Sequence, residues 1–403
     1  MRILIALIIS TFFLSCQTES PTKLKQGNYL GTLTLHDEEI LPFNFKVTKD
    51  SLIEIYNAEE VIEVDEILYS NDSIRINFPV FEGYIKGKFE NGNIVDGQFI
   101  KESLDRIVPF QSTFGETERF PKAKASTISV DGEWELLFTE DDGSTFIGKG
   151  FLTQKDSKVT GTIRTTTGDY RYLEGVVDGD VMRISAFDGA HAFLFVASLE
   201  GEELSGYFYS GNHYKASFKG KLNPEFELPD ENTLTYLNEG YDKFEFSFPD
   251  KNGNEVSLDD ALFQDKVVIV QIMGTWCPNC LDESKFYAQY ARENSEKDIQ
   301  FVALAFEYAK TKERAFAGIN RLKDRLQINY PILLAQVGSS DKGLAQEKLP
   351  MLNHVLSYPT TIFLDKQGEV RKIHTGFNGP ATGDKYIAFK QEFDDYVNLI
   401  LNE

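Results

Sequence analysis

The stretch from residue 267 to residue 280, which reads VVIVQIM-GTWCPNC, decides the fold of the C-terminal part. Residues 267–273 are apolar except for Gln271, which predicts a buried β-strand. A helical pattern begins at the Cys-x-x-Cys motif, so the motif lies where a strand passes into a helix. The N–H groups and dipole at a helix N-terminus favour a thiolate at Cys277, and Cys280, one turn further on, can attack a mixed disulfide formed there. The motif therefore predicts a redox-active cysteine pair.

Two other uses of this cysteine pair are disfavoured. Zinc usually needs four ligands, and the sequence has no second cysteine pair and only single histidines nearby, His354 and His374. A purely structural disulfide across two residues would close a very small loop and would stabilise the fold little. We expect neither a metal site nor a cofactor.

Strands and helices alternate in the C-terminal part of the chain. The predicted strands are 266–273, 299–306 and 361–364, and the predicted helices are 280–290 and 385–401. Strands interleaved with helices indicate a central sheet that is covered on both faces. We therefore expect an α/β domain over residues 242–403, preceded by a linker over residues 223–241.

The N-terminal half has the pattern of an all-β structure. Between residues 29 and 222, short segments of alternating apolar and polar residues are separated by turn signals such as Asn91-Gly92. This pattern predicts a sandwich or a barrel. Residues 72–83 and 180–189 are similar, so the half is either one larger assembly or two tandem domains. The tandem division places β-rich domains at 29–114 and 129–222.

Composition and charge exclude other classes of protein. The chain has 403 residues and only three cysteines, too few for a disulfide-stabilised scaffold. Its 63 acidic and 41 basic residues give a net charge of −22, which repels nucleic acid and anionic lipid headgroups. We expect no nucleic-acid partner.

The N-terminus has the pattern of an export signal. A single positive charge is followed by an apolar run over residues 3–14. The run is too short to span a bilayer as a permanent helix, which needs about 20 residues. Phe13-Leu14-Ser15-Cys16 resembles the lipobox of bacterial lipoproteins. This resemblance implies a lipoprotein signal peptide over residues 1–15, lipidation of Cys16 and a tether over residues 16–28.

Residues 242–403 resemble the thioredoxin-fold domain of the TlpA/ResA-like group of membrane-tethered thiol–disulfide oxidoreductases. The resemblance rests on Trp276-Cys277-x-x-Cys280 and on Ser357-Tyr358-Pro359-Thr360-Thr361, which stands ahead of a strand as the cis-proline loop of the group does. The residues around Phe248-Pro249-Asp250 resemble the hairpin that precedes the domain. Residues 308–349 would hold the extra helical insertion of the group.

The resemblance implies a role for each motif residue. Cys277 would be the attacking nucleophile and Cys280 the resolving thiol. Pro359 in cis would expose the backbone of Tyr358 for pairing with an extended substrate segment, and only X-Pro bonds adopt the cis form readily. Trp276 would shield and orient the cysteine pair.

One position departs from the thioredoxin pattern. Thioredoxin itself carries a buried Asp where this chain has Gln271, and an amide cannot accept the proton that Cys280 must lose. Glu307, directly after the strand 299–306, matches the position of an active-site Glu in ResA-like relatives. A carboxylate near a half-buried thiol would have a raised pKa and could take that proton.

Two families with related chemistry fit the sequence less well. A peroxiredoxin would carry Pro and Thr where this chain has Val270 and Gly274. A copper chaperone of the Sco type would space its cysteines by three residues, whereas two residues separate Cys277 from Cys280.

The sequence as a whole predicts an exported, lipid-anchored thiol–disulfide oxidoreductase that faces the periplasm and reduces disulfides of other cell-envelope proteins. The expected partners are envelope proteins with cysteine pairs, a membrane thiol that donates electrons, and the membrane itself through the lipid. The alternative is an envelope protein whose β-rich half binds a partner or ligand, with the redox domain as an accessory.

Overall fold

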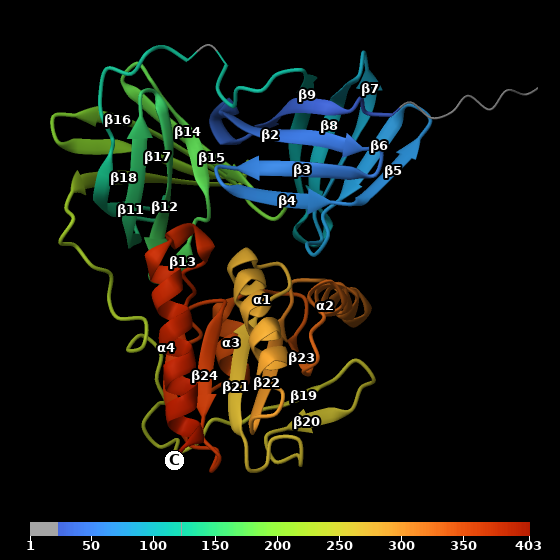
Figure 1. Cartoon of the computed structure of the whole chain (residues 1–403), viewed down its shortest axis with the longest axis vertical. Coiled ribbons are helices and arrows are strands. Elements are labelled where there is room, and N and C mark those ends of the chain that lie inside the picture. Colours follow the sequence, from blue (N-terminus) through green and yellow to red (C-terminus); the bar gives the residue numbers. More distant parts are fainter. Residues whose placement is uncertain (1–22, 122) are drawn as a thin grey trace, which may run out of the picture.

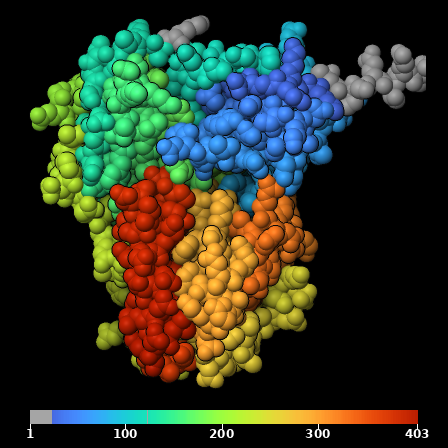
Figure 2. Space-filling view, viewed as in Figure 1, coloured from blue at the N-terminus to red at the C-terminus, as the bar shows by residue number. Residues whose placement is uncertain are grey.

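The computed structural model describes residues 23–121 and 123–403. The predicted signal peptide and Cys16 lie outside the described residues. Two β-sheet parts lie side by side, and both rest on one end of an α/β domain (Figure 1). Figure 2 shows their surfaces in contact with that end, from which α4 (Asp384–Leu401) runs toward the C-terminus.

The first β part is a nine-stranded sheet in the order β4-β3-β2-β1-β9-β8-β7-β6-β5. Successive strands pair with one another except β4 and β5, and β1 also pairs with β9, so the sheet is open between β4 and β5 in the described residues. Two short 3-10 turns, His36–Glu38 and Glu102–Leu104, interrupt it. The strands are β1 (Gly27–Thr34), β2 (Ile40–Lys49), β3 (Leu52–Asn57), β4 (Glu60–Val64), β5 (Glu66–Ser70), β6 (Ser73–Asn77), β7 (Tyr84–Glu90), β8 (Asn93–Lys101) and β9 (Arg106–Phe114).

The second β part has a similar order of strands but closes into a barrel. Its order is β11-β10-β18-β17-β16-β15-β14-β12-β13, and an additional pairing of β11 with β12 joins the two ends. Buried aromatic side chains fill the interior, where the rings of Phe195 and Phe208 stack 4.5 Å apart. The strands are β10 (Gly132–Thr139), β11 (Thr145–Lys155), β12 (Lys158–Thr165), β13 (Gly168–Asp169), β14 (Leu173–Asp178), β15 (Val181–Phe187), β16 (Ala192–Glu200), β17 (Glu203–Ser210) and β18 (Tyr214–Leu222).

The C-terminal part is a five-stranded mixed sheet in the order β23-β22-β21-β24-β25. Strand β21 lies at its centre, and all seven of its residues are buried, as the apolar run predicted. A hairpin of β19 (Ser247–Pro249) and β20 (Glu255–Ser257) precedes the sheet. The sheet strands are β21 (Val267–Met273), β22 (Ile299–Phe306), β23 (Ile332–Gln336), β24 (Thr360–Leu364) and β25 (Val370–Thr375), and the other helices are α1 (Pro278–Glu293), α2 (Lys312–Leu326), α3 (Lys342–Lys348) and the 3-10 turn Pro380–Thr382.

The predicted fold class, an all-β half followed by an α/β thioredoxin fold, is confirmed. Residues 308–349 contain the helices α2 and α3, and they also contain a strand that was not among the predicted strands. Between α2 and α3 they contain β23, which pairs in parallel with β22 at the edge of the sheet. Its five residues are all buried, and so short an apolar run cannot be distinguished from a buried helical segment by its pattern.

Helices α1 and α4 cover one face of the α/β sheet (Figure 1). Phe286 of α1 and Phe393 of α4 meet with ring centroids 5.1 Å apart, and Phe363 of β24 lies beneath Phe393 at 5.5 Å.

In the described residues, no helix is both long enough and apolar enough to cross a membrane.

The segment between the barrel and the α/β domain is bound to that domain along part of its length. The amide of Thr375 donates to the carbonyl of Glu231, and the hydroxyl of Thr375 donates to that of Thr235 at 2.7 Å. Leu237 forms an isolated bridge with Leu352. The barrel is therefore attached to the redox domain by an ordered segment, residues 223–241, called here the strap.

Arg171 of the barrel joins all three parts of the molecule. Its guanidinium pairs with Glu60 of the first sheet, with Asp188 of the barrel at 3.6 Å and with Asp282 of α1 at 2.5 Å. The side chain is 8% exposed. Burial opposes its charge, but the carboxylates of Asp282, Glu60 and Asp188 hold its pKa well above the ordinary value. The cation is therefore a buried junction between elements far apart in the sequence.

Replacing Arg171 with Met is expected to lower the free energy of unfolding by about 3 kcal/mol, because three carboxylates lose their buried cation. Urea titration of the full chain measures this. Arg325→Met is the matched control, since Arg325 also bridges two parts, to Asp65, but both partners are exposed. The control should cost less than about 1 kcal/mol. Equal losses in the two variants would contradict a special role for the buried junction.

Candidate active site

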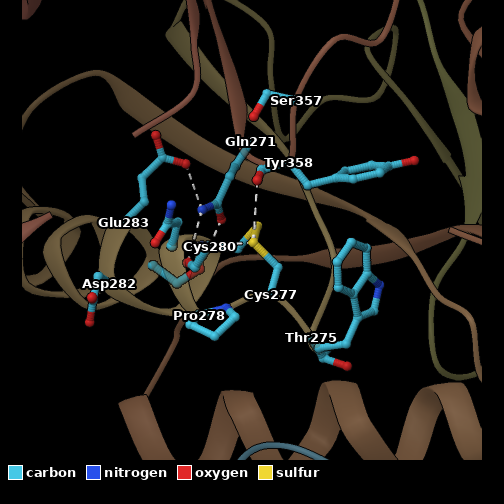
Figure 3. Close-up of a disulfide and its surroundings, with 12 residues drawn as sticks. Gln271, Thr275, Cys277, Pro278, Cys280, Asp282, Glu283, Ser357 and Tyr358 are labelled. Atoms are coloured by element: carbon cyan, nitrogen blue, oxygen red, sulfur yellow. Dashed lines mark hydrogen bonds between the residues drawn. A yellow bond between two sulfur atoms is a disulfide. The ribbon is translucent and has the colours of Figure 1, made fainter. Parts of the chain in front are cut away.

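The two cysteines of the Cys-x-x-Cys motif lie at the start of α1 and form a disulfide (Figure 3). Cys277 is the N-cap residue of α1, and its sulfur accepts a hydrogen bond from the amide of Cys280 at 3.1 Å. Pro278 fills the first helical position, where its missing N–H leaves nothing unpaired. The helix N-terminus thus points its free donors and positive dipole end at the sulfur of Cys277.

The loop before β24 lies against the disulfide. The Tyr358–Pro359 peptide bond is cis, and the carbonyl oxygen of Tyr358 is 3.3 Å from the sulfur of Cys277. Figure 3 shows this carbonyl directed at the sulfur. Cys277 is 5% exposed and Cys280 is fully buried. The disulfide is therefore enclosed, with the cis-proline loop forming one wall.

Trp276 forms part of the same enclosure. Its indole N–H donates to the carbonyl of Phe306 at 2.9 Å, which fixes the ring at the end of β22. The ring lies against those of Tyr308 and Tyr358, with centroids 5.6 and 5.4 Å away. The structure thus brings Trp276, Tyr358 and Pro359 together around Cys277.

Glu307 is buried but is hydrogen-bonded to Thr275 rather than to a cysteine. Its two carboxylate oxygens accept the amide and the hydroxyl of Thr275 at 2.7 and 2.8 Å. Burial raises the pKa of Glu307 to about 7, and these hydrogen bonds oppose the rise. Glu307 also lines a cavity of about 320 Å³ between the first sheet and the redox domain, together with Trp276 and Tyr308. Its carboxyl can therefore change its protonation near neutral pH while bound to Thr275, which precedes Cys277 by two residues.

A second buried carboxyl, which is not among the predicted site residues, lies on the other side of the motif. Glu283 accepts hydrogen bonds from Gln271 at 2.8 Å, from Thr361 at 3.0 Å and from Tyr287 at 3.1 Å. The Gln271 amide also lies 3.4 Å from the carbonyl oxygen of Cys280. Burial raises the pKa of Glu283 to about 7. The signal that could have identified Glu283 is its position three residues after Cys280, because residues three apart on a helix lie on the same face.

The structure offers no obvious metal centre. In the described part of the chain, no group of three or more His, Cys, Asp or Glu side chains has the geometry to hold a metal ion. Of the two histidines considered, His374 lies within hydrogen-bond distance of Asn232 in the strap, at 3.1 Å. Burial lowers the pKa of His374 to about 4, which keeps the ring neutral.

Glu283→Gln is expected to remove part of the pH dependence of stability. Burial raises the folded-state pKa of Glu283 from 4.5 to about 7, so as the pH rises the unfolded chain loses this proton first. The free energy of unfolding therefore falls across that interval, by about 3 kcal/mol for this one carboxyl. Urea titrations at about pH 5 and about pH 8 should show a smaller loss in the variant.

Glu307→Gln is the matched comparison, because burial raises its pKa to about 7 as well. This variant should reduce the loss of unfolding free energy over the same pH interval by a similar amount. If both variants lose as much stability between the two pH values as the unsubstituted chain does, the two carboxyls are not protonated in the folded state as inferred.

Comparison with known proteins agrees with this geometry. The Redoxin family model matches residues 225–387, so both β parts lie outside the matched region. The Thioredoxin-like protein YneN of Bacillus subtilis is 32% identical over 143 residues, which are 35% of this chain and 73% of that protein. The thiol-disulfide oxidoreductase ResA of Bacillus subtilis is 26% identical over 166 residues, or 41% of this chain and 76% of ResA.

A solved structure is also similar to part of the chain. The crystal structure of a thiol:disulfide interchange protein of the thioredoxin family from Chlorobium tepidum TLS is 20% identical, with a TM-score of 0.29, and the match covers 41% of this chain and 98% of that one. With the Redoxin match and the relationship to YneN and ResA, the chain belongs to the TlpA/ResA-like thiol–disulfide oxidoreductases.

Proposed function

We propose that this thiol–disulfide oxidoreductase is exported, anchored by lipid on Cys16, and reduces disulfides of cell-envelope proteins through Cys277 and Cys280. The observation that carries the redox part is the disulfide at the N-terminus of α1 beside the cis Tyr358–Pro359 bond. The export and anchoring parts rest on the sequence pattern of residues 1–16. For the chain as a whole we propose the predicted division, with a tether, two β-rich domains, a linker and the redox domain from residue 242.

In the reduced enzyme, Cys277 is the nucleophile. The amide of Cys280 and the helix dipole favour its thiolate. The thiolate attacks one sulfur of the substrate disulfide, the substrate S–S bond breaks, and its other sulfur leaves as a thiolate that takes a proton. Cys280 then loses its proton and attacks Cys277, which releases the second substrate thiol and leaves the Cys277–Cys280 disulfide. A membrane thiol donor returns two electrons to restore the dithiol.

The side chains around the pair support these steps. Pro359 holds the backbone of Tyr358 against Cys277, where an extended substrate segment would pair, and Trp276 shields the reacting sulfur from water. Glu307 is the proposed acceptor of the Cys280 proton, which reaches it indirectly because the carboxylate is held by Thr275 and not by a cysteine. Its raised pKa of about 7 and the cavity that it lines support this role.

Cys277→Ser should abolish reduction of insulin disulfides by the full chain in the presence of a thiol donor, because the attacking sulfur is absent. Cys280→Ser should keep the first step but not the second, so a mixed disulfide with the substrate should accumulate and be visible on a non-reducing gel. Retained turnover in Cys277→Ser would overturn the assignment of the nucleophile.

Glu307→Gln should slow insulin reduction and remove the rise in rate that the unsubstituted enzyme shows as the pH increases through about 7. Glu283→Gln is the control, because it removes the other buried carboxyl with the same pKa. If only Glu283→Gln changes the pH profile, Glu283 and not Glu307 is the base.

A further inference from the structure

A hairpin of the barrel lies across the active site. Residues 164–171, called here the covering hairpin, turn between β12 and β13 and run on toward β14. The hydroxyl of Ser357 donates to the carbonyl of Thr167 at 2.8 Å, and the side-chain amide of Asn279 donates to the carbonyl of Asp169 at 3.1 Å. Ser357 stands two residues before Pro359, and Asn279 stands between the two cysteines. The backbone of the hairpin is thus bound from both sides of the redox centre.

Further contacts fix the two ends of the covering hairpin. The carboxylate of Asp169 accepts the amide of Gly379 at 2.6 Å, and the guanidinium of Arg164 donates to the Asn378 side chain at 3.0 Å. At the other end, Arg171 donates to the carbonyl of Pro278 at 3.3 Å. These contacts are hydrogen bonds and ion pairs rather than an apolar core, which is typical of interfaces that can separate.

The fit between the hairpin and the site leaves no room for a side chain at Gly168. Gly168 has a φ of +136°, and a Cβ there would lie 2.2 Å from the Asn279 amide nitrogen and 3.0 Å from the carbonyl oxygen of Phe377. Facing it, a Cβ on Gly376 would lie 2.9 Å from the carbonyl carbon of Thr167. The backbones at Gly168 and Gly376 are therefore so close to each other's surroundings that neither position has room for a side chain.

Disulfide exchange needs a third sulfur to approach the one attacked, and Cys277 is only 5% exposed while the hairpin is in place. We propose that the covering hairpin occupies the peptide-binding groove of the enzyme, formed by Asn279, Ser357 and Gly379, and that a substrate chain must displace it to reach Cys277. This rests on the proposed function, in which Cys277 attacks a protein disulfide.

The same contacts define the substrate class. The groove presents three donors, two of which take backbone carbonyls and one of which takes a carboxylate. Between them the space admits only a glycine or a similarly bare stretch of backbone. The preferred substrate is an extended chain with a glycine followed by an acidic residue, as in Gly168-Asp169.

The test compares Gly168→Ala and Gly168→Val with Gly132→Ala in the full-length oxidised chain. Gly132 is the matched control because its φ is +124°, while its Cβ would meet only the side chain of Leu222, at 3.1 Å. The rate at which a reduced protein thiol reduces the Cys277–Cys280 disulfide is measured by acid quench and alkylation. The Gly168 variants should react about tenfold faster or more, and Gly132→Ala should react as the unsubstituted chain does.

Hydrogen exchange at the amide of Gly379, which Asp169 binds, reports whether the hairpin has left. A freed amide with an unchanged rate overturns the proposal. A hairpin that stays bound even in Gly168→Val also overturns it, since a substrate chain could not displace it either. The measurement follows reduction of the enzyme's own disulfide and needs no substrate turnover, so failure of the proposed function would appear separately, as an unsubstituted chain that does not reduce insulin.

Discussion

The arrangement of the whole molecule depends on the burial of one cation, Arg171. A guanidinium cannot be taken out of water without carboxylates around it, because the desolvation penalty is several kcal/mol. Here Glu60, Asp188 and Asp282 provide them, one from each of the three parts. The charges are satisfied only when the first sheet, the barrel and α1 are all in place, so the ion pairs fix how the parts are arranged.

This junction lies at the N-terminus of the helix that carries the redox pair. Asp282 follows Cys280 by two residues, and the carbonyl that Arg171 binds belongs to Pro278, between the cysteines. The β half is therefore not a remote spacer for the redox domain. Its covering hairpin and the side chain of Arg171 both contact the start of α1, beside the proposed nucleophile Cys277.

Local patterns in the sequence were enough to predict the redox domain. The all-buried strand β21, the strand-to-helix junction at Cys277 and the strand β22 follow from short runs of residues whose environment is set by their own apolar content. Partners distant in the sequence left no such pattern. Arg171 lies 111 residues from both Glu60 and Asp282, and nothing local to Arg171 distinguishes it from a surface arginine. Closure of the barrel through β11 and β12 was equally hidden, since the sequence pattern fits a sandwich as well.

The closed barrel limits how the covering hairpin can move. Its first strand, β12, pairs with β11, β13 and β14, so the hairpin cannot swing out without breaking barrel pairs. The alternative movement is a shift of the whole barrel. It breaks the polar contacts to the redox domain, including the pair between Arg171 and Asp282, and it also disturbs the packing of Phe187 against the aromatic core of the first sheet. The strap at residues 223–241 keeps the barrel attached during such a shift. The ion pairs that hold the three parts together therefore also determine how readily the disulfide becomes accessible.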